Sequence, residues 1–119
     1  MKLDAVQTYA DLKAYIRDRG GLANVGMFRL RDIHGAGKLG VHVVASISER
    51  LSAQGLGHQP EALPSDQNEI VCVYELGSTV GRVFNATRTV NNENTRFLRE
   101  LANNDAADQV KRIREIVCD

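Results

Sequence analysis

The sequence lacks any long run of apolar residues. None of its apolar stretches approaches the roughly 20 residues that a helix needs to cross a bilayer. The N-terminal sequence MKLDAVQTYADLK also lacks the apolar centre of a signal peptide. We therefore expect a cytoplasmic protein that does not associate with a membrane.

Cysteine is scarce as well. Cys72 and Cys118 are the only two cysteines, and they are far apart in the sequence. This spacing suggests neither a disulfide framework nor a zinc ribbon, so we expect free thiols.

Net charge is absent, because fifteen Lys and Arg residues balance fifteen Asp and Glu residues. This balance argues against a protein that coats nucleic acid without specificity. The charges are unevenly distributed, however. Residues 1–50 carry eight basic and five acidic side chains, whereas residues 51–75 carry four acidic side chains and no basic ones. The first half therefore suits a phosphate-bearing partner, and the acidic segment 61–75 must face elsewhere.

What the sequence does contain is typical of one globular domain. The chain has 119 residues, of which 43% are hydrophobic and 25% charged. A chain of this size buries a core without disulfides or metals. We expect a single domain over residues 1–119.

Local signals predict a helix near the N-terminus. Thr8 and Asp11 have the spacing of a capping box, in which Asp11 reaches back to the amide of Thr8. Gly20 and Gly21 suit a left-handed stop. The predicted helix covers about residues 9–19.

A second, short helix is predicted directly afterwards. Asn24 suits its N-cap, and Gly35 to Gly37 end it. Its inward positions are expected to be Val25, Phe28 and Ile33.

The clearest periodicity follows. Val41, Val44, Ile47 and Leu51 are spaced by three, three and four residues, which places them on one apolar stripe of a helix. The pattern predicts a helix from residue 41 to about residue 54, ended by Gly55.

The period then changes to that of β-structure. The run from Ile70 to Tyr74 is β-branched and aromatic, which predicts a strand. Leu56 to Pro60 is its predicted antiparallel partner, and residues 61–68 are the expected connecting loop.

Helices are predicted in the remainder of the chain. Ser78 suits the cap of a helix that carries Val80, Val83 and Phe84, and the segment Asn91 to Asn94 is expected to end it. Two further helices carry the apolar residues Phe97, Leu98 and Leu101, and Val110, Ile113 and Val117; the last helix begins at Asp105.

The order of these elements between residues 25 and 75 resembles that of winged helix-turn-helix domains. A short helix (MFRLRDIHG) is followed by a glycine-rich turn (GAGKLG), a longer amphipathic helix (VHVVASISERLSAQG) and two strands. The resemblance implies an α+β fold that is mainly α with a small β-hairpin. It also implies a winged-helix-like core over residues 8–75 and a helical extension over residues 78–119, which we expect to dimerise.

In this family the helix after the turn enters the major groove of DNA. The resemblance implies that Lys38 and Arg50 contact phosphates, that His42 and Ser46 reach base edges, and that Arg29 and Arg31 hold the backbone. Glu49 and Ala53 share the outward face. A solvated face of a packed helix explains the same residues.

Other kinds of site fit poorly. The turn His34 to Gly40 lacks the glycine spacing and the Ser or Thr of a phosphate-binding loop. His34, His42, His58 and Cys72 have no metal-ligand spacing, and Cys72 lies in the most apolar run of the chain, which disfavours a catalytic set of Cys72, His58 and Asp66. We expect neither enzyme activity nor a cofactor, a bound metal or a small-molecule substrate.

Two hypotheses remain from the sequence. The first is a module that binds double-stranded DNA, as a homodimer, in transcription regulation. The second is a protein-interaction or oligomerisation module that has the winged-helix shape and does not bind nucleic acid. The zero net charge and the acidic wing favour the second hypothesis, since acidic side chains repel phosphate.

Overall fold

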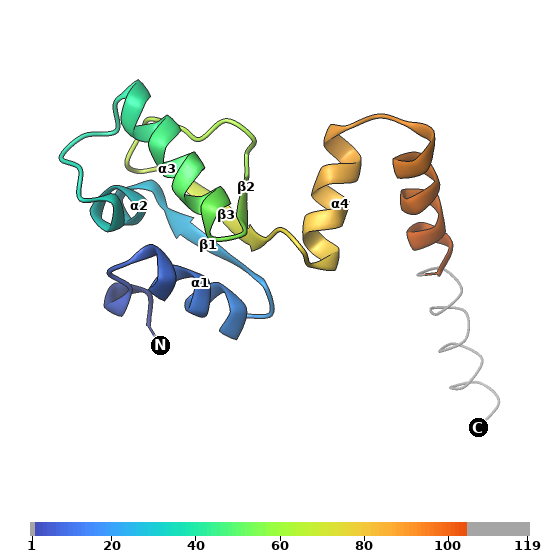
Figure 1. Ribbon diagram of the computed structural model, residues 1–119, viewed down its shortest axis with the longest axis horizontal. Coiled ribbons are helices and arrows are strands. Elements are labelled where there is room, and N and C mark those ends of the chain that lie inside the picture. Colours follow the sequence, from blue (N-terminus) through green and yellow to red (C-terminus); the bar gives the residue numbers. More distant parts are fainter. Residues whose placement is uncertain (1, 105–119) are drawn as a thin grey trace. The chain divides into compact units, whose positions relative to one another are not determined.

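The computed structural model describes residues 2–104 (Figure 1). Contacts divide the chain into two compact units, residues 1–82 and residues 83–119. Each unit is described by itself, and the expectation of a single domain stays a prediction. The predicted α+β fold, mainly α with a small sheet, is confirmed. Its elements are η1 (Leu3–Ala5), α1 (Tyr9–Asp18), β1 (Leu22–Gly26), α2 (Met27–His34), α3 (Val41–Ala53), β2 (Leu56–Gln59), β3 (Ile70–Glu75) and α4 (Thr79–Arg88).

The sheet has three antiparallel strands in the order β1-β3-β2. Leu56 of β2 lies opposite Glu75 of β3, so the predicted strand pair is confirmed. β1 was not predicted. Its residues Leu22 and Gly26 pair with Tyr74 and Ile70 on the other side of β3, which makes β3 the central strand.

The prediction that Asn24 caps a helix is therefore wrong. Asn24 lies within β1, opposite Cys72. The helix begins three residues later, with Gly26 at its N-cap and no side-chain cap hydrogen bond. Because of this shift Phe28 is 45% exposed rather than buried, and Met27 takes the core position instead.

The ends of α1 follow their sequence signals closely. Thr8 Oγ1 accepts a hydrogen bond from the amide of Asp11 at 3.0 Å. The carboxylate of Asp11 accepts from the amide of Gln7 at 3.2 Å, one residue before the predicted partner. At the other end Gly20 and Gly21 have positive φ angles. The amide of Gly21 donates to the carbonyl of Ile16, as in a Schellman motif.

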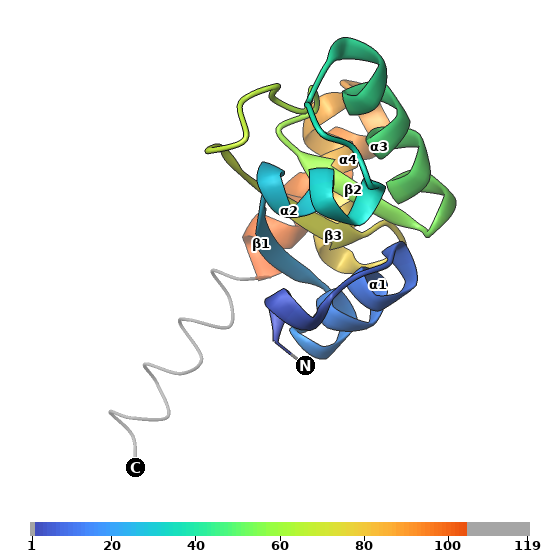
Figure 2. The same cartoon turned by 90° about the vertical axis from the view of Figure 1, so that its left-hand side faces the viewer.

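One hydrophobic core lies between the sheet and the helices. α1 packs against β1 and β3, α2 against β1 and α3, and α3 against β2 (Figure 2). The largest fully buried side chains are Leu12, Ile16, Met27, Leu30, Ile47, Leu51, Leu56, Val25, Val71 and Val73. The fold therefore fixes the orientation of α3 about its own axis.

The predicted apolar stripe of α3 is correct only in part. Ile47 and Leu51 are fully buried and Val44 is half-buried, but Val41 is 81% exposed. Val41 is the first residue of α3 and extends past the end of the core. Leu39 in the preceding turn is buried, so the core needs no side chain from Val41.

Serine and asparagine caps organise the later helices. Ser78 Oγ accepts from the amide of Gly81 at 3.1 Å, as predicted for a cap of α4. Asn91 does more than follow α4, since its Oδ1 accepts from the amide of Asn94 at 2.7 Å and so caps the helix over residues 92–104. The helix predicted from Asp105 lies outside the described residues. Within residues 2–104, no helix has the length and apolar character to cross a bilayer.

Candidate nucleic-acid interface

α3 presents one side to the core and the opposite side to solvent. The buried side is fixed by Ile47 and Leu51. The exposed side carries small or polar side chains together with Val41, namely His42, Ala45, Glu49, Ser52 and Ala53. The helix begins at Gly40, which forms no side-chain cap, so the first-turn amides of α3 point toward solvent. We call this exposed side, from Val41 to Ala53, the outer face of α3.

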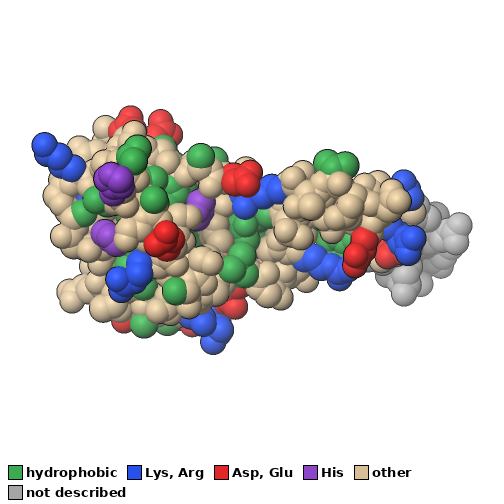
Figure 3. Space-filling view, turned by 45° about the horizontal axis from the view of Figure 1, so that its top comes forward, with side chains coloured by type: hydrophobic (Ala, Val, Ile, Leu, Met, Phe, Trp, Pro, Cys, Tyr) green, Lys and Arg blue, Asp and Glu red, His purple; other side chains and the backbone are tan. Residues whose placement is uncertain are grey.

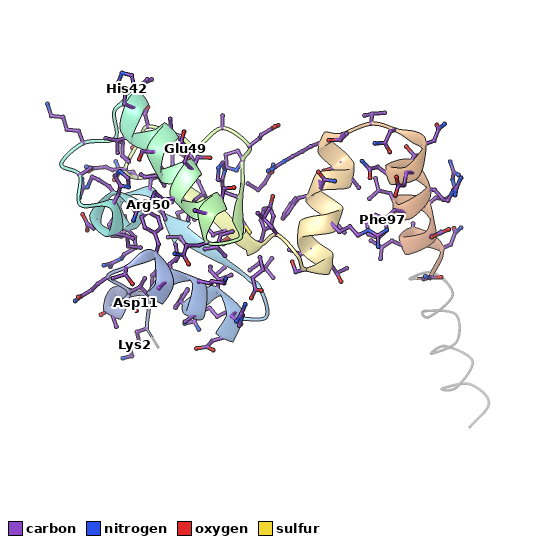
Figure 4. All side chains as sticks on the ribbon, viewed as in Figure 1. Lys2, Asp11, His42, Glu49, Arg50 and Phe97 are labelled. Atoms are coloured by element: carbon purple, nitrogen blue, oxygen red, sulfur yellow. The ribbon has the colours of Figure 1, made fainter. Side chains whose placement is uncertain are left out.

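The predicted contacts around α3 lie along this helix and the turn before it. Lys38 and His42 are exposed at its N-terminal end, and Ser46 is half-buried one turn after His42. Arg50 follows another turn later and is exposed. Figure 4 shows His42 at the outer end of the helix, Glu49 midway and Arg50 on the flank. The sequence spacing therefore brings these side chains to one helix, with Arg50 at its edge.

The guanidinium group of Arg50 is held against α1. Its Cζ lies 5.1 Å from the centroid of the Tyr9 ring, within the range of a cation–π contact. The hydroxyl of Tyr9 and Nδ1 of His34 are 2.8 Å apart and share a hydrogen bond. Burial raises the pKa of Tyr9, and the charge of Arg50 partly opposes that effect. Arg50 thus starts from an orientation set by residues of α1 and α2.

The two arginines of α2 have different surroundings from those around α3. Arg31 forms an ion pair with Asp32 at 3.1 Å and donates a hydrogen bond to Gln67 Oε1. Arg29 is half-buried and its Cζ lies 5.4 Å from the centroid of the Phe28 ring. Its Nε is buried and has no hydrogen-bond partner among the described residues. Arg31 is already engaged within the protein, whereas Arg29 retains an unsatisfied donor.

The acidic loop between β2 and β3 is docked on the body of the unit. The amides of Met27 and Phe28, at the start of α2, donate to the carbonyls of Glu69 and Gln67 at 2.9 and 3.2 Å. Leu63 packs against the core. The sequence predicted the loop and its charge but not this docking, which joins residues about forty positions apart. The loop therefore helps to complete α2 and its backbone does not project as a separate arm at that end.

His58 joins α3 to this loop. It is buried on β2, where its Nδ1 lies 2.8 Å from the carbonyl oxygen of Pro60 and its Nε2 lies 2.8 Å from Ser48 Oγ. The sequence analysis considered His58 only as a metal ligand or catalytic residue. The signal that was available is the alternation of β2, since Leu56 and His58 share the inward side of the strand.

The surface of the first unit has no continuous basic patch in the view of Figure 3, where blue and red side chains are scattered over the face shown. Among residues 2–104, no group of three His, Cys, Asp or Glu side chains is placed to hold a metal ion. Burial raises the pKa of the Cys72 thiol, which makes the thiolate less available.

Comparison of the chain with models of known protein families gave no match, and neither did comparisons with curated proteins and with solved structures.

Proposed function

We propose that the first unit is a winged helix-turn-helix module that binds double-stranded DNA, with α3 as its recognition helix. The observation that carries the proposal is the element order α1-β1-α2-α3-β2-β3 combined with the sheet order β1-β3-β2. This arrangement is similar to that of winged helix-turn-helix domains. It turns the outer face of α3 away from the core, as insertion into a major groove requires.

Two cations and the helix dipole supply the proposed phosphate contacts. Lys38 precedes α3 and Arg50 lies on its flank, so the two charges bracket the outer face. The uncapped first-turn amides add a partial positive charge between them. These groups position the helix and do not discriminate between bases.

Base discrimination then rests on uncharged and acidic side chains. His42 is exposed at the end of α3 that enters the groove first, with Ser46 one turn behind it. Glu49 accepts hydrogen bonds only, and in the major groove cytosine N4 is the donor that suits a carboxylate. A face of this kind binds weakly to arbitrary DNA, in keeping with the zero net charge.

The arginines of α2 contribute unequally to the proposed interface. Arg31 anchors the acidic loop through Gln67 and Asp32, so a phosphate contact would replace existing bonds. Arg29 has an unsatisfied Nε and is the better phosphate contact of the two.

A homodimer completes the proposal. A single recognition helix with two flanking cations makes few contacts, whereas two copies on adjacent half-sites roughly 34 Å apart double them. The helices C-terminal to residue 91 are the proposed dimer contact. Sedimentation equilibrium tests it, because Ile113→Asp should yield monomers while Val90→Asp, at an exposed position, should not.

The direct test of DNA binding is a salt titration by fluorescence anisotropy. The full chain is titrated onto random and genomic duplex between about 50 and 200 mM salt, where phosphate contacts give a negative slope of log affinity on log salt. Lys38→Glu should reduce the magnitude of that slope by about 1. Lys2→Glu is the matched control, because it makes the same charge change at the edge of the unit away from His42 (Figure 4). Absence of binding to both duplexes at low salt would refute the proposal.

The docked acidic loop favours a second candidate, a protein-interaction module. Glu61, Asp66 and Glu69 are exposed and the loop carries no basic residue, which suits a basic protein surface better than phosphate. Neutralising all three as Gln separates the candidates. DNA affinity should rise if α3 binds DNA, while affinity for a basic protein partner should fall if the loop is the interface.

A further inference from the structure

Val41 is an aliphatic side chain at the tip of the proposed recognition helix. It is 81% exposed even though it is β-branched and hydrophobic. The core does not use it, since Leu39 and Val44 occupy the positions on either side of the helix start. A polar residue at this position would leave the folded core unchanged, so folding does not explain the valine.

The exposed side chains of α3 form a row with a distinct chemistry. Ala45 follows Val41 by four residues, and Glu49 follows Ala45 by four, so all three lie on one side of the helix. All three are exposed. The first two carry only methyl groups and no hydrogen-bonding atom. The end of α3 that would enter a groove first therefore presents an apolar strip beside His42.

In the major groove one base carries an apolar group at its edge, which is the C5-methyl of thymine. We propose that Val41 is a specificity-determining residue that contacts a thymine methyl group, with Ala45 extending the same apolar strip. The inference rests on the proposed DNA binding by α3. It assigns thymine to the apolar end of the row and cytosine to the end that carries Glu49.

The expected size of the effect follows from the area of one methyl group. Removing a methyl-sized apolar contact changes an equilibrium constant about threefold to fivefold. Such a contact gives sequence preference without adding charge, so it leaves the salt dependence unchanged.

The test replaces thymine by deoxyuridine, which lacks only the methyl group. Binding sites are first recovered from a random duplex pool with the full chain, and each thymine of the recovered site is then replaced singly. The unaltered chain should lose about threefold to fivefold in affinity at one position or more. Val41→Ala should bind the thymine duplex more weakly by a similar factor and lose the discrimination at that position.

Val90→Ala is the matched control, because Val90 is also an exposed valine, at 90%, and lies outside α3. This variant should discriminate thymine from deoxyuridine as the unaltered chain does. If DNA binds but Val41→Ala keeps the full discrimination, or the unaltered chain shows none, the inference is overturned and the proposed function survives. If no duplex binds at low salt, both are overturned.

Discussion

Ser48 of α3 lies 2.8 Å from Nε2 of the buried His58 on β2. The second ring nitrogen, Nδ1, donates to the carbonyl oxygen of Pro60, because a carbonyl only accepts. In the neutral ring Nε2 then accepts from the hydroxyl of Ser48. One side chain thus links the middle of α3 to the beginning of the acidic loop.

His58→Leu should destabilise the protein by about 1–3 kcal/mol, since it leaves the hydroxyl of Ser48 and the carbonyl of Pro60 without their partner. Urea unfolding followed by circular dichroism measures the effect. His42→Leu is the control, because His42 is exposed and its replacement should change stability by no more than about 0.5 kcal/mol. Equal stability of the two variants would contradict the linking role of His58.

The two ends of the predicted stripe on α3 should respond differently to truncation. Leu51 is fully buried, and Leu51→Ala should cost about 2–5 kcal/mol. Val41→Ala should change stability by less than about 0.5 kcal/mol, because Val41 lies outside the core. Thermal or urea unfolding of the pair measures the contrast. A large loss with Val41→Ala would mean that α3 is rotated or longer than described.

Gly81 should tolerate alanine poorly even though it lies in the first turn of α4, where alanine is the better helix former. A Cβ there would lie 2.6 Å from the carbonyl oxygen of Leu76 and 2.7 Å from that of Glu75. Since both are backbone atoms, the turn must shift, and we expect a loss of about 1–3 kcal/mol. Gly37→Ala meets nothing within 4 Å and should be close to neutral. Urea unfolding distinguishes them, and neutrality of Gly81→Ala would contradict this packing.

Alkaline pH should weaken the packing of α1. Burial raises the pKa of Tyr9 above its usual value of 10.0. Above about pH 10 the unfolded state therefore holds fewer protons than the folded state, so stability falls as pH rises through the folded pKa and is unaffected by this group below it. Tyr9→Phe should show a smaller loss between about pH 10 and 12.

Arg50→Ala provides the opposing variant. The charge of Arg50 lowers the pKa of Tyr9, so its removal should make the alkaline loss of stability larger. Unfolding midpoints in urea at several pH values measure both changes. Identical pH profiles for the two variants would exclude Tyr9 as the source.

Local signals in the sequence sufficed for much of the fold. The Thr8 cap, the two glycines after α1 and the β-branched run of β3 act within a few residues, and each element lies where they indicate. β1 was missed because Asn24 and Gly26 have low strand propensity. The strand exists through its pairing with β3, which lies more than forty residues later.

Similar limits apply to the candidate interface. Helical periodicity placed His42 and Glu49 on the exposed side of α3 correctly, because Ile47 and Leu51 fix that side. The same periodicity placed Val41 wrongly, since it does not indicate where the core ends along the helix axis. The engagement of Arg31 by Gln67 is also a long-range contact that no local pattern encodes.

The central position of β3 has a consequence for how the first unit folds. β3 is the last strand in the chain, yet β1 and β2 both hydrogen-bond to it and not to each other. During synthesis, β1 therefore has no strand to pair with until residues 70–75 have left the ribosome. Closing the loop between Gly26 and Ile70 costs chain entropy before any ladder bond repays it. Helices α1 to α3 can form locally in the meantime, but the sheet should assemble in one late, cooperative step.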